Sequence, residues 1–157
     1  MLKYGRLIAA AALVALSAAP ALSAGAKIGL LTCKTSASIG LIVGSHQRIS
    51  CRYTPDGGGP PEDYAGYINR VGLDLGVTAG GIMTWGVVAP TRGLPHGALA
   101  GKYVGASGDI SVGLGVGANA LVGGSNNTIA LQPLSIEGNT GLNVAAGIAG
   151  VTLSAAP

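Results

Sequence analysis

The sequence predicts an all-β protein, built as a small antiparallel barrel or a two-sheet sandwich. Apolar side chains alternate at period two with polar residues or glycine in short segments through most of the chain, which is typical of β-strands. Clusters drawn from the 28 glycines and 8 prolines separate these segments. Beyond residue 26 no helical periodicity of convincing length is present, and with 10% charged residues the chain could hardly solvate exposed helices.

The N-terminal segment, residues 1–26, predicts a secretory signal peptide. Two basic residues precede an apolar run over residues 7–22, and small residues surround Ala24 and Ala26. The run is shorter than the roughly 20 apolar residues that span a bilayer, so we expect cleavage rather than anchoring. Cleavage after Ala24 or Ala26 fits the pattern. We take Ala26, which leaves a single β domain over residues 27–157 in an exported protein, periplasmic or secreted.

Strands and loops follow in order along the first half of the exported chain. Each expected strand carries β-branched residues and ends at small or polar breaks. The loop "PDGGGPPEDY" places three glycines between prolines, which favours a wide, exposed connection. Strands are expected over residues 27–33, 38–44, 47–54, 64–77 and 81–90, and loops over residues 55–64 and 91–99.

The second half of the chain is richer in glycine. Strands are expected over residues 100–107, 108–124, 126–134 and 140–153. In the last of them the alternation slips by one residue, which predicts a β-bulge near residues 147–150.

The segment "GDISVGLGVGANALVGG" alternates apolar side chains with Gly113, Gly115 and Gly117. Glycine is a poor strand former, so a strand that carries three of them needs a compensating gain. A bare face that another strand or sheet packs against would supply it. We therefore expect these three glycines to form a packed glycine face.

The two cysteines, Cys33 and Cys51, are 18 positions apart and predict one disulfide bond. In an oxidising compartment, cysteines on neighbouring strands most often pair. A metal site would need more ligands than His46 and His96, which have no paired spacing. We expect no metal, and no nucleotide cofactor, because the glycine-rich loops lack the lysine and helix start of a phosphate loop.

The charge of the exported chain is close to balanced. Seven basic and six acidic residues follow position 26, a net charge of +1. A nucleic-acid partner is therefore not expected, since no basic stripe is evident that could follow a phosphate backbone. An integral outer-membrane barrel is not expected either, because six aromatic residues in the whole chain are too few for aromatic girdles.

Three stretches together resemble a known family. They are "YTPDGGGPPEDYAGYINRVGLDLGVTAGGIMTWGVVAPT", "GALAGKYVGAS" and "GVGANALVGGSNNTIALQPLSIEGNTGLNVAAGI". They are similar to the small exported proteins of alphaproteobacteria grouped as domain of unknown function 992. The resemblance covers nearly all of residues 27–157 and implies an exported, single-domain protein of the bacterial cell envelope. Residues 110–154 also resemble SYLF-type lipid-binding domains, which implies lipid binding by the glycine-rich half.

Candidate catalytic groups do not form a recognisable constellation. Glu62 and Asp63 are adjacent, so on a strand they would point to opposite faces and could not act as a carboxylate pair. Asp74 lies in an apolar stretch, where the solvated face of a strand explains it better than a buried acid does. No G-x-S-x-G elbow presents a nucleophile.

A possible ligand surface combines Trp85, Arg92 and His96, because tryptophan, arginine and histidine near a proline-flanked loop suit contact with carbohydrates or lipid head groups. We favour a second interpretation, which places Trp85 in the core of a chain that lacks phenylalanine. The sequence thus favours a non-enzymatic cell-envelope protein with a structural or binding role and a lipid, glycan or protein partner. The alternatives are a lipid-binding module that uses the glycine-rich half and, third, an uncharacterised hydrolase.

Overall fold

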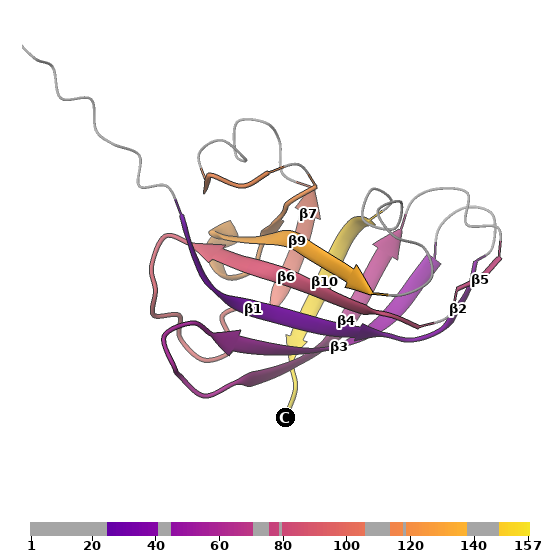
Figure 1. Ribbon diagram of the computed structural model, residues 1–157, viewed down its shortest axis with the longest axis horizontal. Coiled ribbons are helices and arrows are strands. Elements are labelled where there is room, and N and C mark those ends of the chain that lie inside the picture. The colour runs from indigo at the N-terminus through magenta and orange to yellow at the C-terminus, as the bar shows by residue number, and fades with distance from the viewer. Residues whose placement is uncertain are drawn as a thin grey trace, which may run out of the picture.

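The computed structural model describes residues 25–40, 45–70, 76–78, 80–105, 114–117, 119–137 and 148–157 (Figure 1). The strands are β1 (Ala26–Thr35), β2 (Ser38–Gly40), β3 (Ser45–Pro55), β4 (Glu62–Arg70), β5 (Gly76–Thr78), β6 (Ile82–Ala89), β7 (Gly101–Gly105), β8 (Leu121–Gly123), β9 (Ile129–Glu137) and β10 (Ile148–Ala155), and η1 (Ser125–Asn127) is a short 3-10 turn. Eight strands close an antiparallel barrel in the order β1-β3-β4-β10-β7-β8-β9-β6, while β2 and β5 pair separately. The predicted β class is confirmed, and of the two expected architectures the chain adopts the barrel.

Large side chains fill the inside of the barrel. Trp85, Tyr64 and Tyr103 are at most 2% exposed, and Leu31 and Leu131 are fully buried among them. An eight-stranded barrel is just wide enough inside for side chains to fill it. In a chain without phenylalanine, tryptophan and tyrosine supply the aromatic volume. The inward side of the wall is therefore used for packing.

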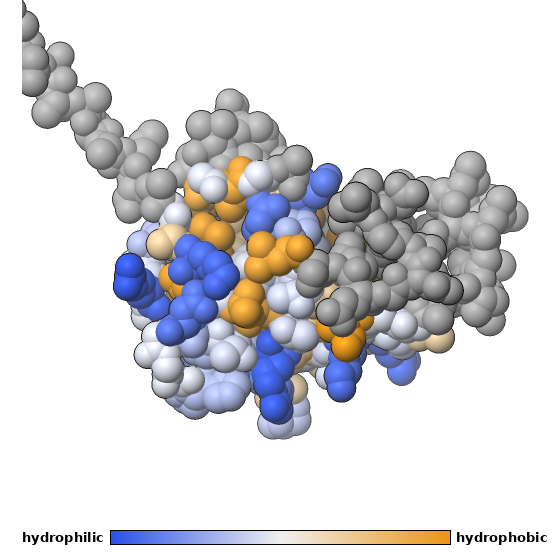
Figure 2. Space-filling model, in the orientation of Figure 1, coloured by the Kyte–Doolittle hydropathy of each residue, from blue (hydrophilic) through white to orange (hydrophobic). Residues whose placement is uncertain are grey.

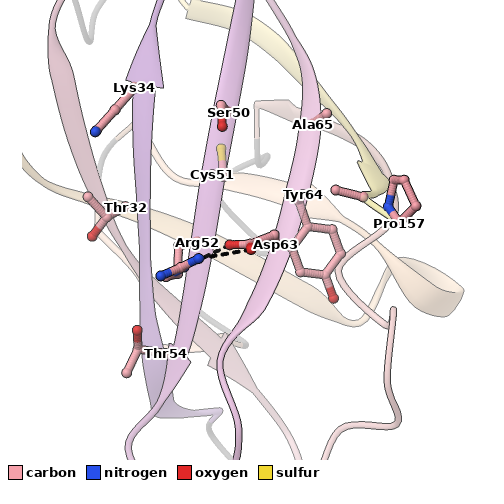
Figure 3. Close-up of a pocket in the computed structure, with 11 residues that line it drawn as sticks. Thr32, Lys34, Ser50, Cys51, Arg52, Thr54, Asp63, Tyr64, Ala65 and Pro157 are labelled. Carbon is pink, nitrogen blue, oxygen red and sulfur yellow. Dashed lines mark hydrogen bonds and ion pairs between the residues drawn. The ribbon is translucent and has the colours of Figure 1, made fainter.

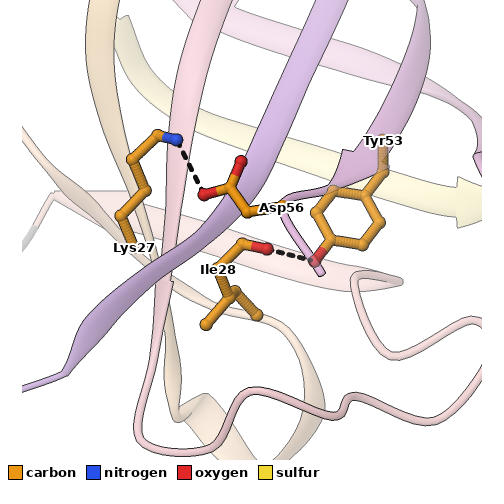
Figure 4. A network of polar contacts seen from close by, with 4 residues as sticks. All are labelled: Lys27, Ile28, Tyr53 and Asp56. Atoms are coloured by element: carbon orange, nitrogen blue, oxygen red, sulfur yellow. Dashed lines mark hydrogen bonds and ion pairs between the residues drawn. The ribbon is translucent and has the colours of Figure 1, made fainter. Parts of the chain in front are cut away.

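A glycine on β1 makes room for a further buried aromatic ring, that of Tyr53. Gly29 on β1 faces inward beside Tyr53 of β3, and a Cβ atom at Gly29 would lie 2.5 Å from the tyrosine ring. The Tyr53 hydroxyl donates to the carbonyl of Ile28 at 3.4 Å (Figure 4). The N–H of Asp56 donates to the same oxygen at 2.9 Å. Ile28 lies where the pairing register between β1 and β6 shifts. The two donors therefore supply hydrogen bonds to a backbone carbonyl at an irregularity in the sheet.

The predicted disulfide and the predicted bulge are both present. Cys33 and Cys51 are directly opposite each other on β1 and β3, and their sulfur atoms are bonded. The register between β10 and β4 shifts between Ile148 and Gly150, within the range expected for the bulge.

The outer wall has two unlike sides. We call the outward side chains of β1, β3 and β4 the polar face, because lysine, arginine, serine, threonine and aspartate dominate it. We call the outward side chains of β6, β8 and β9 the apolar face. It is built around Val88, Val122 and Ala130, with Leu114 and Val116 packed against them. Figure 2 shows hydrophobic side chains gathered over β6 and β9, bordered by hydrophilic ones.

The packed glycine face is a prediction that the structure corrects. Gly115 and Gly117 are exposed and belong to no strand, and Gly113 lies outside the described residues. Gly115 has a φ of 69°, a left-handed conformation that glycine adopts without steric cost. The segment 114–117 uses glycine to turn, so that Leu114 and Val116 can cover the apolar face. The strand expected over residues 108–124 is reduced, in the described part, to β8.

Candidate functional site

The polar face contains a shallow hollow of about 600 Å³ where β1, β3 and β4 run beside the end of the chain (Figure 3). Outward side chains recur at every second residue, so three neighbouring strands present their polar groups on one surface. The hollow is lined by Thr32, Lys34, Ser50, Cys51, Arg52, Thr54, Asp63, Tyr64, Ala65, Ala156 and Pro157.

One ion pair crosses the floor of this hollow. Arg52 of β3 donates from Nε and Nη2 to the two carboxylate oxygens of Asp63 on β4, at 2.8 and 2.9 Å. The hydrogen bond to Arg52 lowers the pKa of Asp63 below its ordinary value. Both side chains are more than half exposed, so the pair contributes little to folding and remains accessible to a ligand.

Hydroxyl groups surround the ion pair. Thr32 is the cross-strand partner of Arg52, and Ser50 and Thr54 flank Arg52 at two residues' distance along β3. All three are exposed, and a hydroxyl both donates and accepts hydrogen bonds. The surface can therefore bind a ligand that carries many hydroxyl groups of its own.

A second polar cluster lies at the rim of the barrel, around Glu62 at the start of β4. Its carboxylate accepts hydrogen bonds from the hydroxyl of Tyr64 and, at 3.1 Å, from the N–H of Gly97, and it lies 3.2 Å from Nδ1 of His96. Burial raises the pKa of Glu62, but the bonds from Tyr64 and Gly97 and the adjacent His96 lower it, and the net pKa is below the ordinary value. Such a carboxylate is a fixed acceptor and not a proton donor at neutral pH.

The Glu62 cluster connects β4 to the loop before β7. It fastens the loop before β7, whose Ala98 and Leu99 are buried against the core. The carbonyl of Leu99 in turn accepts the hydroxyl of Tyr103 at 2.8 Å. The cluster therefore has a clear role in holding this loop.

A third polar contact lies at the start of β1. Lys27 pairs with Asp56 at 2.9 Å, and both side chains are nearly half exposed (Figure 4). The contact joins β1 to the exposed loop after β3. Like the pair in the hollow, it is an exposed ion pair of small energetic weight.

The structure separates the predicted ligand surface. Trp85 is 2% exposed and faces the core, because the alternation of β6 directs it inward, so it cannot share a surface with Arg92 and His96. Arg92 is exposed, and the His96 side chain is 83% exposed beside Glu62. Glu62 and Asp63 do point to opposite faces of β4, as expected. Asp74 lies outside the described residues.

The hollow was missed by the sequence reasoning, although a signal for it exists. Along β3, polar residues recur at every second position as His46, Arg48, Ser50, Arg52 and Thr54. This alternation identifies a solvated strand face. It does not reveal which strands lie beside it, and the hollow depends on β1 and β4 as neighbours.

Within the described ranges no group of three or more histidine, cysteine, aspartate or glutamate side chains could hold a metal ion, and no helix is long and apolar enough to cross a membrane. The absence of a cofactor remains a prediction from the sequence.

Comparison with known proteins identifies one family model. The model described as "Protein of unknown function (DUF992)" matches residues 11–154, nearly the whole chain. No curated protein and no solved structure matches.

Proposed function

Since this chain belongs to the DUF992 family, a family of unknown function, we propose from the site itself that it is a non-enzymatic binding protein of the bacterial cell envelope. Its ligand is a hydroxyl-rich glycan, held in the hollow of the polar face. The observation that carries this proposal is the lining of the hollow, where hydroxyl groups from β1 and β3 surround the ion pair of Arg52 and Asp63.

Export is supported by two features. The disulfide joins the only two cysteines, and such bonds persist in oxidising compartments. The first barrel strand begins at Ala26, so removal of residues 1–24 would leave every described strand intact. Cleavage after Ala26 would remove a single residue of β1.

A binding role is favoured over catalysis by the state of the acidic groups. Asp63 is paired with arginine, and Glu62 accepts hydrogen bonds that lower its pKa. A general acid needs the opposite shift, a pKa raised toward neutral. Polar planar groups and hydroxyls on a rigid sheet instead suit recognition of a sugar.

The test is a titration of the disulfide-bonded protein with N-acetylglucosamine tetrasaccharide and with a soluble peptidoglycan digest, followed by amide chemical shifts. We expect shifts that map to β1, β3 and β4. Thr32→Val removes a hydroxyl from the hollow and should weaken binding, while Thr152→Val, on β10 and outside the hollow, should not. If neither probe shifts these amides at millimolar concentration, the proposal is wrong.

A further inference from the structure

Three cations of the polar face occupy strand positions around Ser50. Along β3, Arg48 and Arg52 lie two residues to either side of Ser50, and on β1 its cross-strand partner is Lys34. Alternate residues of a strand are about 7 Å apart and neighbouring strands about 5 Å apart. Three long cationic side chains can therefore reach one point above the Ser50 hydroxyl.

Two of these cations have no acidic partner among the described residues. Arg52 is paired with Asp63, but within the described part of the chain neither Lys34 nor Arg48 takes part in an ion pair. The cluster has three positive charges and one negative charge, an excess of two. This excess matches the charge of a phosphate monoester, which is about −1.5 to −2 at neutral pH.

The fourth side of Ser50 is open. Its cross-strand partner on β4 is Ala65, which is exposed and carries only a methyl group. A ligand can approach over this alanine, with the Ser50 hydroxyl below it as a hydrogen-bond donor. Thr32, two residues before Lys34 on β1, adds a second hydroxyl on the far side. Arginine, lysine and hydroxyl donors around one point are the set that recognises phosphate oxygens.

We propose that Ser50, Lys34, Arg48 and Arg52 form a phosphate-binding subsite, which takes a phosphate substituent on the glycan. The inference rests on the proposed function and adds the charge of the ligand. Lys34 and Arg48 supply the attraction, the Ser50 hydroxyl donates to a phosphate oxygen, and Arg52 stays anchored by Asp63 while its remaining N–H groups face the ligand.

The test is an amide chemical-shift titration of the disulfide-bonded protein with inorganic phosphate, glucose 1-phosphate and glucose. We expect the two phosphates to shift amides near Ser50 and to bind more weakly as sodium chloride is raised. Lys34→Gln and Arg48→Gln should each weaken phosphate binding about five-fold, an effect in the range of one typical net hydrogen bond. Lys102→Gln removes an exposed lysine from β7, outside the polar face, and should leave binding unchanged.

The outcomes separate the subsite from the proposed function. If the uncharged tetrasaccharide binds the hollow but phosphate shifts no amide near Ser50, the subsite is wrong and glycan binding stands. If phosphate binds equally well to Lys34→Gln, Arg48→Gln and Lys102→Gln, the subsite is also wrong. If phosphatidylglycerol vesicles bind and phosphatidylcholine vesicles and glucose 1-phosphate do not, the anion comes from a lipid and the glycan assignment is overturned.

Discussion

The polar and apolar faces are both formed by the outward side chains of barrel strands, but the first is exposed to water and the second is covered by another segment of the chain. On the polar face the outward side chains stay in water, and charges are neutralised in part by exposed ion pairs. On the apolar face the chain returns over its own wall, and Leu114 and Val116 cover Val88, Val122 and Ala130. A barrel wall of one architecture thus forms an open polar surface on one side and a second small core on the other.

The two faces differ in whether another segment of the chain covers them, and not in the geometry of their strands. Ala65 on the polar face and Ala130 on the apolar face are both outward-facing alanines with a cross-strand neighbour on either side. Ala65 is exposed, whereas Ala130 has no exposed surface. The two positions therefore offer a matched pair for testing what coverage contributes.

The largest effect is expected when a charge is placed at each of these alanines. Ala130→Asp puts an unpaired carboxylate between Val88 and Val122 and should lower the free energy of unfolding by about 3–5 kcal/mol. Ala65→Asp places the same group in water near arginine and lysine and should leave stability almost unchanged. Urea denaturation of both variants measures the contrast. An equal loss in the free energy of unfolding for the two variants would contradict the conclusion that only the apolar face is shielded from water.

The next effect is expected from the disulfide beneath the polar face. Replacement of Cys33 and Cys51 by alanine should cost about 3 kcal/mol, because the bond closes a loop of 18 residues and so restricts the unfolded chain. The apolar face has no such crosslink, so amide hydrogen exchange should accelerate more in β1 and β3 than in β8 and β9. Uniform acceleration over all the strands would contradict this localisation.

The fold could be predicted from the sequence because period-two alternation and turn chemistry are local signals. The bulge in β10 followed from a slip in that alternation, whereas the disulfide followed from two cysteines in a chain expected to be exported. The hollow of the polar face could not be predicted, because β1, β3 and β4 become neighbours only through the closed strand order. For Trp85 the sequence offered both a ligand surface and the core, and the core placement, which the lack of phenylalanine favours, is confirmed.

The glycine-rich segment failed as a prediction for a different reason. Alternation of apolar residues with glycine fits a strand, but it fits equally well a turn whose apolar side chains pack against the surface beneath it. Leu114 and Val116 pack against the apolar face, and Gly115 between them adopts the left-handed conformation. The backbone angle that decides between these structures is not visible in the hydrophobic pattern.

A smaller effect is therefore expected from Gly115, and it separates conformation from packing. Gly115→Ala should cost about 1–2 kcal/mol, because a Cβ atom strains the left-handed backbone. Gly117→Ala is the control, since a Cβ atom there would make only ordinary contact with Gln132, 3.5 Å away. Thermal unfolding of both variants gives the comparison. Equal losses at the two glycines would contradict the assignment of the cost to the left-handed backbone at Gly115.

The smallest effect distinguishes two neighbouring acids of β4. Glu62 points inward at the rim and accepts hydrogen bonds from Tyr64 and Gly97, while Asp63 points outward into the hollow. Glu62→Gln should lower stability at neutral pH by about 1 kcal/mol, because a neutral amide accepts these bonds less strongly than a carboxylate. Asp63→Asn, the control, should have no measurable effect on unfolding, because its ion pair is exposed.

The pH dependence of that difference follows from the direction of the pKa shift. The pKa of Glu62 is lower in the folded protein than its ordinary value, so the ionised carboxylate stabilises the folded state more than the protonated acid does. The stabilisation is complete above the ordinary pKa of glutamate and is lost as the pH falls through the lower, folded value. The stability gap between the parent protein and Glu62→Gln, measured by urea denaturation, should therefore narrow below about pH 4. A gap that widens on acidification would mean that Glu62 is held in the protonated form, and the carboxylate would no longer be the group that fastens the loop to the rim.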